Sequence, residues 1–107
     1  MHVSLLTERQ RAELLANGQR TAKGESHDPF PVVKLFTPDA GCTWLLTEID
    51  PEDPDIAFGL CDLGLGFPEL GYVSLDEVES IRLPLGGLRI ERDLWFTPKP
   101  LREVRGV

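Results

Sequence analysis

Cysteine and histidine are scarce in this chain of 107 residues, which holds two of each. Cys42 and Cys61 are too few for a disulfide-rich secreted scaffold, and two free, half-buried thiols are favoured over a single bridge. A zinc site needs three or four such ligands at recognisable spacing, and no such pattern exists. Nucleophilic catalysis would have to use His2, His27 and Cys42, which the sequence does not bring together. An enzyme is therefore the least favoured class.

Long apolar runs are also missing. No stretch approaches the ~20 apolar residues that span a bilayer. The N-terminus, Met1 to Leu6, leads directly into Glu8 and Arg9 and lacks the basic region and apolar core of a signal peptide. These features predict a cytoplasmic protein with no membrane association. The length fits a single domain over residues 1–107.

Basic residues are absent from one long stretch. Between Lys34 and Arg82 there is no lysine, arginine or histidine, although this part holds eleven acids: Asp39, Glu48, Asp50, Glu52, Asp53, Asp55, Asp62, Glu69, Asp76, Glu77 and Glu79. This middle carries −11 and the two ends carry +4, which gives the net charge of −7. A solvated surface that maintains solubility explains this pattern, and so does a docking face for a basic partner. Direct binding of nucleic acid is not expected, because affinity for its phosphate backbone comes from lysine and arginine side chains.

The densest acidic segment runs from Asp50 to Asp55 and includes Glu52 and Asp53. Four acids in six residues suggest a hard cation such as Ca²⁺, but the spacing does not match an EF-hand loop. Position six of that loop needs glycine and position twelve glutamate, where this chain has Asp55 and Cys61. We therefore predict no metal and no cofactor, and interpret the segment as a rigid acidic connection.

A glycine-rich segment, Gly64-Leu65-Gly66, resembles a phosphate-binding loop only superficially. Glu69 stands where a dinucleotide-binding fingerprint needs its third glycine, and no lysine follows. Glycines that permit tight turns are the preferred interpretation. A small-molecule pocket near Gly64–Gly71, or near Trp95, remains the alternative to a docking function.

Two helices are expected. Leu5–Gly18 begins with Thr7 as N-cap and Gln10 at N3, a capping-box spacing, and Asn17-Gly18 is typical of a helix end. A second, short helix near residues 75–81 opens with Ser74 and Glu77 at the same spacing.

Five segments have strand character: 32–36, 43–49, 56–63, 70–73 and 89–96. Turn residues separate them, and the last alternates with Ile90, Leu94 and Phe96 on one face. The predicted fold class is α+β, in which the N-terminal helix packs on a mostly antiparallel sheet of four to five short strands, with the second short helix at one edge.

The two tryptophans differ in their expected roles. Trp44, at the start of a strand, is expected in the core. Trp95 falls on the polar face of its strand, where tryptophan marks an interface or covers the edge of the core.

Three runs of residues carry a resemblance to a known family. They are Val33–Gly41, Thr43–Glu48 and Phe58–Leu75, of which the last is the most specific. With the Leu5-Leu6-Thr7 helix start and Ile90–Asp93, they cover nearly the whole chain, which resembles the bacterial domain of unknown function 2958 family. The resemblance implies a stand-alone bacterial domain that is often carried on plasmids and on integrative or phage-related elements. It implies no catalytic residue and no cofactor.

The function hypothesis that follows is a non-enzymatic interaction or inhibitor protein of a mobile element, for example an anti-defence factor. Its partner would be a host or mobile-element protein with a basic, nucleic-acid-binding surface. Monomer and homodimer are both open. A small-molecule or nucleotide-binding protein that sequesters its ligand is the alternative. The candidate partner-binding residues are Asp50, Glu52, Asp53, Asp55, Glu69 and Trp95.

Overall fold

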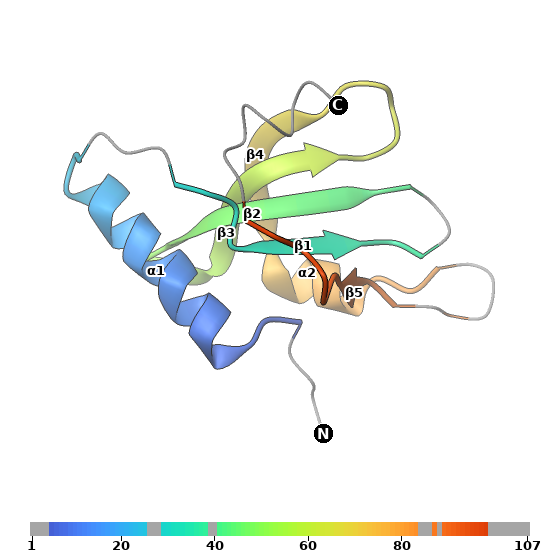
Figure 1. The fold of residues 1–107 in the computed structure, drawn as a ribbon, viewed down its shortest axis with the longest axis horizontal. Helices are drawn as coiled ribbons and strands as arrows, with labels where there is room; N and C mark the ends of the chain where they lie inside the picture. The colour runs from blue at the N-terminus through green and yellow to red at the C-terminus, as the bar shows by residue number, and fades with distance from the viewer. Residues whose placement is uncertain (1–4, 26–28, 39–40, 84–86, 88, 99–107) are drawn as a thin grey trace.

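The computed structural model describes residues 5–25, 29–38, 41–83, 87 and 89–98 (Figure 1). This part of the chain forms two helices and five strands, which confirms the predicted α+β class. In chain order they are α1 (Glu8–Ala22), β1 (Val33–Phe36), β2 (Thr43–Asp50), β3 (Asp53–Asp62), β4 (Glu69–Ser74), α2 (Leu75–Ser80) and β5 (Glu91–Arg92).

The strands form one antiparallel sheet in the order β4-β3-β2-β1-β5. The first four are joined in chain order, so each pairs with its neighbour in sequence, while β5 returns to pair with β1 at the far edge. The predicted mostly antiparallel sheet is confirmed. Figure 1 shows α1 crossing one end of the sheet, and α2 follows β4 directly and contacts β3 and β4.

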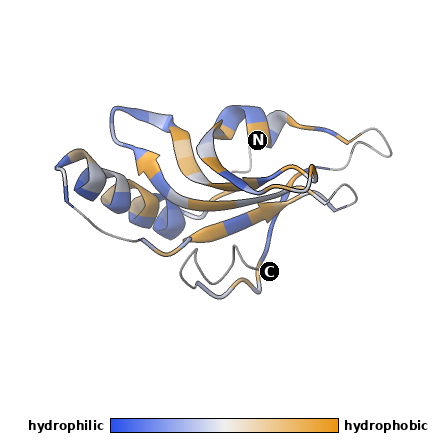
Figure 2. Ribbon diagram, turned by 90° about the horizontal axis from the view of Figure 1, so that it is seen from above, coloured by the Kyte–Doolittle hydropathy of each residue, from blue (hydrophilic) through white to orange (hydrophobic). Residues whose placement is uncertain are grey.

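The core lies between the helices and one face of the sheet. Leu14 of α1 is fully buried in the same core cluster as Val33 and Leu35 of β1 and Leu46 of β2. Trp44 is also in this core, as expected. Figure 2 shows the amphipathic character of α1 and the apolar stretches along the strands. Burial of these side chains, at roughly 1.5–3 kcal/mol for each large aliphatic residue, holds α1 on the sheet.

Helix α1 extends beyond its predicted end at Gly18. Thr7 is the N-cap, and the predicted capping box with Gln10 is present. The helix nevertheless continues to Ala22, because Asn17 and Gly18 contact β2 instead of ending the helix. The Asn17 side-chain amide donates to the Thr47 carbonyl at 2.9 Å, and Gly18 is a buried helical residue. Asn17 and Gly18 locally favour a helix end, but their packing on β2 keeps them inside the helix.

The acidic connection predicted over Asp50–Asp55 is a tight hairpin. Strand β2 ends at Asp50 and β3 begins at Asp53, so only Pro51 and Glu52 form the turn. The prediction that the third strand begins at Ile56 is therefore wrong by three residues. Asp50 Oδ1 accepts a hydrogen bond from the Glu52 amide at 2.9 Å, which stabilises this turn.

Helix α2 begins as predicted at Ser74, whose Oγ accepts from the Glu77 amide at 3.2 Å. A carboxylate from another strand adds to this N-terminus. Asp55 of β3 accepts from the Asp76 amide at 2.8 Å. The helix is thus fixed to β3 as well as to β4, which precedes it.

The predicted strand over residues 89–96 is mostly wrong, since β5 contains only Glu91 and Arg92. Asp93 ends it. The Asp93 amide donates to the Lys34 carbonyl at 2.9 Å, and its side chain then accepts from the Trp95 amide at 2.8 Å in a turn. Leu94 is therefore exposed instead of lying beside the buried Ile90. The turn chemistry of one aspartate overrides the alternating pattern.

Candidate interaction surfaces

The acidic hairpin presents its carboxylates in fixed positions. Glu52 and Asp53 are exposed, and Asp50 is half-buried. The side chains of Asp50 and Asp53 each accept from a backbone amide two residues later, at 2.9 and 3.2 Å. These bonds orient the carboxylates without neutralising them.

Asp55 is the structural member of this group. It accepts from Ser74 Oγ at 2.5 Å and from the Asp76 amide at 2.8 Å. The Ser74 hydroxyl, the Asp76 amide and the charge of Arg11 hold the pKa of Asp55 below its usual range. Asp55 therefore joins the hairpin to the first turn of α2. We define the acidic end as the carboxylates gathered here: Asp50, Glu52, Asp53, Asp55, Asp76 and Glu77.

The other two candidate residues lie elsewhere. Glu69 pairs with Cys61 near the opposite end of β3 from Asp53, about 26 Å away at ~3.3 Å per residue. Trp95 follows β5 at the other edge of the sheet and is 90% exposed, so it does not cover the edge of the core. The structure therefore brings Asp50, Glu52, Asp53 and Asp55 together and separates Glu69 and Trp95 from them.

An apolar surface was not predicted from the sequence. The connection after β3 and the outward side of β4 expose five large side chains, which we call the apolar ledge: Leu63, Leu65, Phe67, Leu70 and Tyr72. Leu65 and Phe67 are each 77% exposed and Tyr72 is 72% exposed. Contiguous apolar residues of this kind mark interaction sites on protein surfaces. The signal available in the sequence was the alternation of large apolar residues with glycine, which we interpreted only as turn chemistry.

The turn interpretation of the glycines is itself confirmed. Gly64 and Gly66 have φ angles of 78° and 94°, in the left-handed region that favours glycine. Asp62 Oδ1 accepts from the Gly64 amide at 2.9 Å, which fixes the start of the connection. The two glycines thus allow Leu65 and Phe67 to project from a tight connection.

A hollow of about 320 Å³ lies beside the ledge. It extends from Trp44 and Cys61 to Gly71 and Val73, and the ledge residues complete it. Its position matches the pocket considered near Gly64–Gly71. Cys61 is half-buried here and its pKa is raised by burial, so its thiol is not an activated nucleophile.

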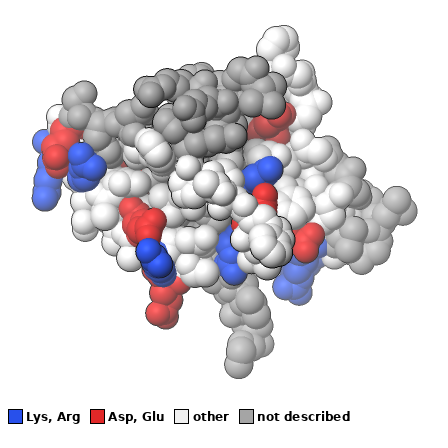
Figure 3. All heavy atoms as spheres, viewed as in Figure 1, with Lys and Arg blue, Asp and Glu red and all other residues white. Residues whose placement is uncertain are grey.

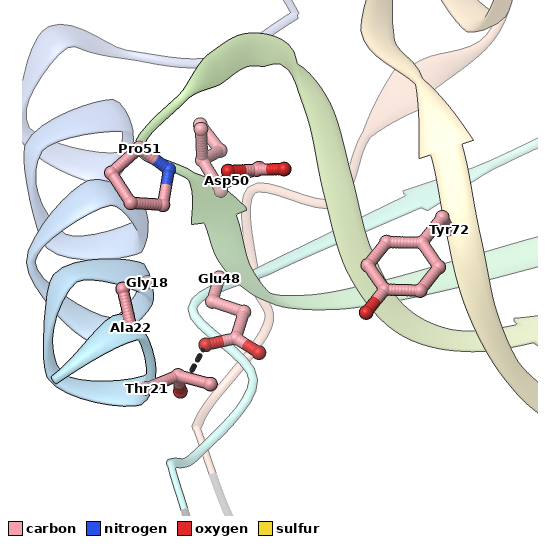
Figure 4. Close-up of a pocket in the computed structure, with 8 residues that line it drawn as sticks. Gly18, Thr21, Ala22, Glu48, Asp50, Pro51 and Tyr72 are labelled. Carbon is pink, nitrogen blue, oxygen red and sulfur yellow. Dashed lines mark hydrogen bonds between the residues drawn. The ribbon is translucent and has the colours of Figure 1, made fainter. Parts of the chain in front are cut away.

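A second, smaller hollow of about 190 Å³ adjoins the acidic end (Figure 4). It lies between α1 and the β2–β3 hairpin, with the side chains of Glu48 and Asp50 on one side and Tyr72 on the other. Thr21 Oγ1 of α1 donates to Glu48 Oε2 at 2.6 Å. This hollow continues the negative surface of the acidic end toward α1.

Acids and bases lie close together on the face drawn in Figure 3, where red and blue side chains alternate instead of occupying separate areas. Ion pairs contribute to this arrangement: Arg9–Glu13 at 3.3 Å, Arg20–Glu25 at 3.6 Å and Lys34–Asp93 at 3.7 Å. Acids and bases are therefore interspersed on this face, and the carboxylates of the acidic end lie together at the β2–β3 hairpin and the start of α2.

The catalytic arrangement considered from the sequence falls partly outside the described residues, because His2 and His27 are both excluded from them. Cys42 lies in the turn before β2, where its amide donates to Thr37 Oγ1 at 3.0 Å. Within the described ranges, no group of three or more His, Cys, Asp or Glu residues is placed to hold a metal ion. Neither described helix is long and apolar enough to cross a membrane.

Comparison with protein-family models gives a match over nearly the whole chain. The model of a family described as protein of unknown function (DUF2958) matches residues 5–103. The comparisons with curated proteins and with solved structures found no match. The match therefore supplies a family for nearly the whole chain without an activity, and the surfaces described above are the basis for a functional argument.

Proposed function

Because the chain belongs to the DUF2958 family, whose function is unknown, we propose its function from its surface: a non-enzymatic protein that docks through its acidic end on a basic partner. The partner in this proposal is a host or mobile-element protein that binds nucleic acid. Docking would block its basic groove, so the protein would act as an inhibitor, for example against a defence complex.

The observation that carries this proposal is the fixed position of the acidic end. The tight turn at Pro51 and Glu52 limits the motion of the hairpin, and Asp55 ties it to the first turn of α2. Carboxylates that are already oriented lose little conformational freedom on binding, which favours affinity for one partner. Flexible acidic segments would serve solubility equally well, so the rigidity supports docking over solubility alone.

The charge pattern supports a nucleic-acid-binding partner. A groove that binds phosphates is lined with lysine and arginine, and a rigid row of carboxylates meets the same groups. The chain has no basic residue between Lys34 and Arg82, so no lysine or arginine from the hairpin or α2 would oppose such a groove. Complementary charge of this kind also accelerates association.

A capture experiment with two matched variants tests the proposal. The first reverses three charges of the acidic end, Asp50→Lys, Glu52→Lys and Asp53→Lys, and leaves the structural Asp55 intact. The control reverses three acids elsewhere, Glu13→Lys, Glu25→Lys and Glu91→Lys. Wild type and the control should capture the same basic, nucleic-acid-binding protein from host lysate, and the acidic-end variant should not.

The second measurement is the release of the captured protein by salt and by competing nucleic acid. Raising NaCl from about 0.1 M to about 1 M shortens the Debye length from ~10 Å to ~3 Å and should release the captured protein. Added DNA or RNA should also displace it, because both would occupy the same groove. Equal capture by the wild type and the acidic-end variant would contradict the proposal.

A small-molecule-binding function is the second candidate, and the hollow beside the apolar ledge favours it. The volume of about 320 Å³ falls at the lower end of known ligand pockets, and its lining is mainly apolar. Native mass spectrometry of protein purified from its host would detect a retained ligand. Filling the hollow with Gly71→Leu should release such a ligand, and a protein that carries none would contradict this function.

A further inference from the structure

The two edges of the sheet differ in how they are protected from pairing with another strand. The edge formed by β5 is two residues long, carries the charged pair Glu91 and Arg92, and is closed by the turn at Asp93. A short, charged edge followed by a turn resists further strand addition. The sheet therefore ends at β5.

The edge formed by β4 has none of these protections. Its six residues pair with β3 in one unbroken register, whereas the β2–β3 pairing contains register shifts. The strand contains no proline, lysine or arginine, and Glu69 is its only charged residue. No strand of the described residues pairs with the outer side of β4, so its backbone N–H and C=O groups on that side are available to another strand.

The apolar ledge lies along this same edge. Leu70 and Tyr72 project from β4 on one face of the sheet, where Tyr72 packs on Phe58 with a ring separation of 4.9 Å. Leu65 and Phe67 extend the ledge just before β4 begins. An unprotected edge and an exposed apolar surface thus coincide, and each alone is a feature that soluble proteins avoid.

We propose that a second copy of this chain occupies this edge, and that two β4 strands pair antiparallel about a two-fold axis. A two-fold axis perpendicular to the sheet keeps each side chain on its own face of the sheet. Two residues that pair across the axis must therefore point to the same face, which requires that one residue of β4 lies opposite the same residue of the other copy. With Gly71 opposite Gly71 of the other copy, Leu70 lies opposite Tyr72 and Glu69 opposite Val73. The side-chain alternation of β4 permits this register, and we choose it because it pairs Leu70 with Tyr72 on the same face.

This register makes the edge complementary to itself. Two Leu70–Tyr72 pairs form across the junction, and such apolar cross-strand pairs stabilise a sheet. The two Glu69 side chains lie at opposite ends of the paired strands and do not face each other. Gly71 has no side chain, so no side chain at this position crowds either face of the sheet at the axis.

The uncharged character of the ledge favours a second copy over a basic partner. Only Glu69 among the β4 residues would attract a basic peptide, and Asp53 of the hairpin is about 26 Å from it along β3. An identical surface with the same apolar residues supplies the better match. The hairpin carboxylates Asp50, Glu52 and Asp53 lie beyond the strand residues that pair in this dimer, and the dimer does not depend on the proposed docking function.

Mass measurement tests the dimer. Sedimentation velocity and light scattering should give twice 11.9 kDa at high protein concentration. Raising the salt concentration should favour the dimer, because each copy carries a net charge of −7 and salt screens their repulsion. Docking on a basic partner has the opposite salt dependence, so failure of one proposal is distinguishable from failure of the other.

Paired charge variants test the register. Leu70→Lys with Tyr72→Lys places like charges opposite each other across the junction and should give a monomer. Leu70→Lys with Tyr72→Glu places opposite charges there and should restore the dimer, although both variants remove the same apolar side chains. Glu91→Lys at the β5 edge is the control and should stay dimeric. Circular dichroism and thermal unfolding show whether each variant is folded.

Cross-linking supplies a second measurement. In a background of Cys42→Ser and Cys61→Ser, Gly71→Cys should form a disulfide between copies on mild oxidation, because the two positions meet at the axis. Glu91→Cys should not. A wild-type protein that stays monomeric at millimolar concentration would overturn the proposal. The proposal would also be overturned if the Leu70→Lys, Tyr72→Lys variant stayed dimeric and the Gly71→Cys variant did not cross-link.

Discussion

Gly18 of α1 lies so close to Ile49 of β2 that a Cβ at position 18 would sit 1.8 Å from the Ile49 carbonyl oxygen. Backbone meets backbone at this point, and the helix rests directly on the strand. The contact also fixes the angle at which α1 approaches the β2–β3 hairpin, and therefore the small hollow beside the acidic end.

Gly18→Ala should destabilise the protein, although alanine is the better helix former by ~1 kcal/mol. Overpacking costs ~1–3 kcal/mol, and a contact this short with backbone belongs at the upper end. We expect a net loss of about 2 kcal/mol in the free energy of unfolding, measured in urea. Gly71→Ala is the control, because a Cβ there meets nothing within 4 Å. Equal stability of the two variants would contradict the observed packing.

Asp55→Asn should flatten the dependence of stability on pH. The pKa of Asp55 is lowered in the folded state, so its charged form stabilises the fold above the unfolded-state pKa. That contribution is lost as the pH falls through the folded-state pKa. Urea unfolding between about pH 7 and pH 3 should show wild type losing more stability than the variant. Glu52→Gln removes a charge from the same hairpin and controls for net charge. Parallel curves for wild type and Asp55→Asn would count against this role.

Cys61 should react slowly with alkylating reagents. Burial raises the pKa of its thiol, which lowers the thiolate fraction at neutral pH, and burial also restricts access of the reagent. Iodoacetamide labelling of the Cys42→Ser variant measures this thiol alone. The rate should rise strongly once urea unfolds the chain. A folded rate equal to the unfolded rate would show that Cys61 is exposed.

Arg92 joins the end of the sheet to the start of α1. Its Nη1 donates to the Leu5 carbonyl at 2.6 Å, in a half-buried contact. Hydrogen bonds to charged groups contribute ~1.5–3 kcal/mol, and partial exposure reduces this. Arg92→Ala should therefore cost about 1–2 kcal/mol of unfolding free energy. The exposed Arg89→Ala should change it by less than about 0.5 kcal/mol. Equal effects would contradict a specific role for Arg92.

Trp95→Ala should leave stability within about 0.5 kcal/mol of wild type, because the side chain is 90% exposed. The remaining fluorescence then comes from Trp44, which is buried. Emission of the variant should shift to shorter wavelength and resist quenching by acrylamide. Unchanged quenching would mean that Trp95 is covered in solution, for example by a second copy or a partner.

Local chemistry in the sequence predicted much of the fold. The caps at Thr7 and Ser74 and the turns between strands operate over a few residues, so both helix caps and the approximate positions of most strands were predicted from them. The order of the strands in the sheet was not predicted. The errors occurred where contacts with residues distant in the sequence determine where a helix or strand ends. Asn17 and Gly18 favour a helix end locally, but β2 uses them for docking, and Asp93 ends a strand that alternation would have continued.

The candidate surfaces were less predictable for the same reason. The acids are evident in the sequence, but only the register of β3 and β4 shows that Glu69 lies at the far end from Asp53. The contact of Asp55 with Ser74 and Asp76 joins residues 19 and 21 positions apart and has no local signal. The exposure of Leu65 and Phe67 could not be predicted, because apolar residues between strands are ordinarily assumed to face the core.

The order β4-β3-β2-β1-β5 also has a consequence for how the chain folds. Strands β1 to β4 pair with their sequence neighbours, so this meander needs only short loop closures and can assemble on the ribosome as soon as it emerges. Strand β5 pairs Arg92 with Leu35 and must close a much longer loop. We expect it to dock last, and hydrogen exchange should find its amides opening before those of β2 and β3.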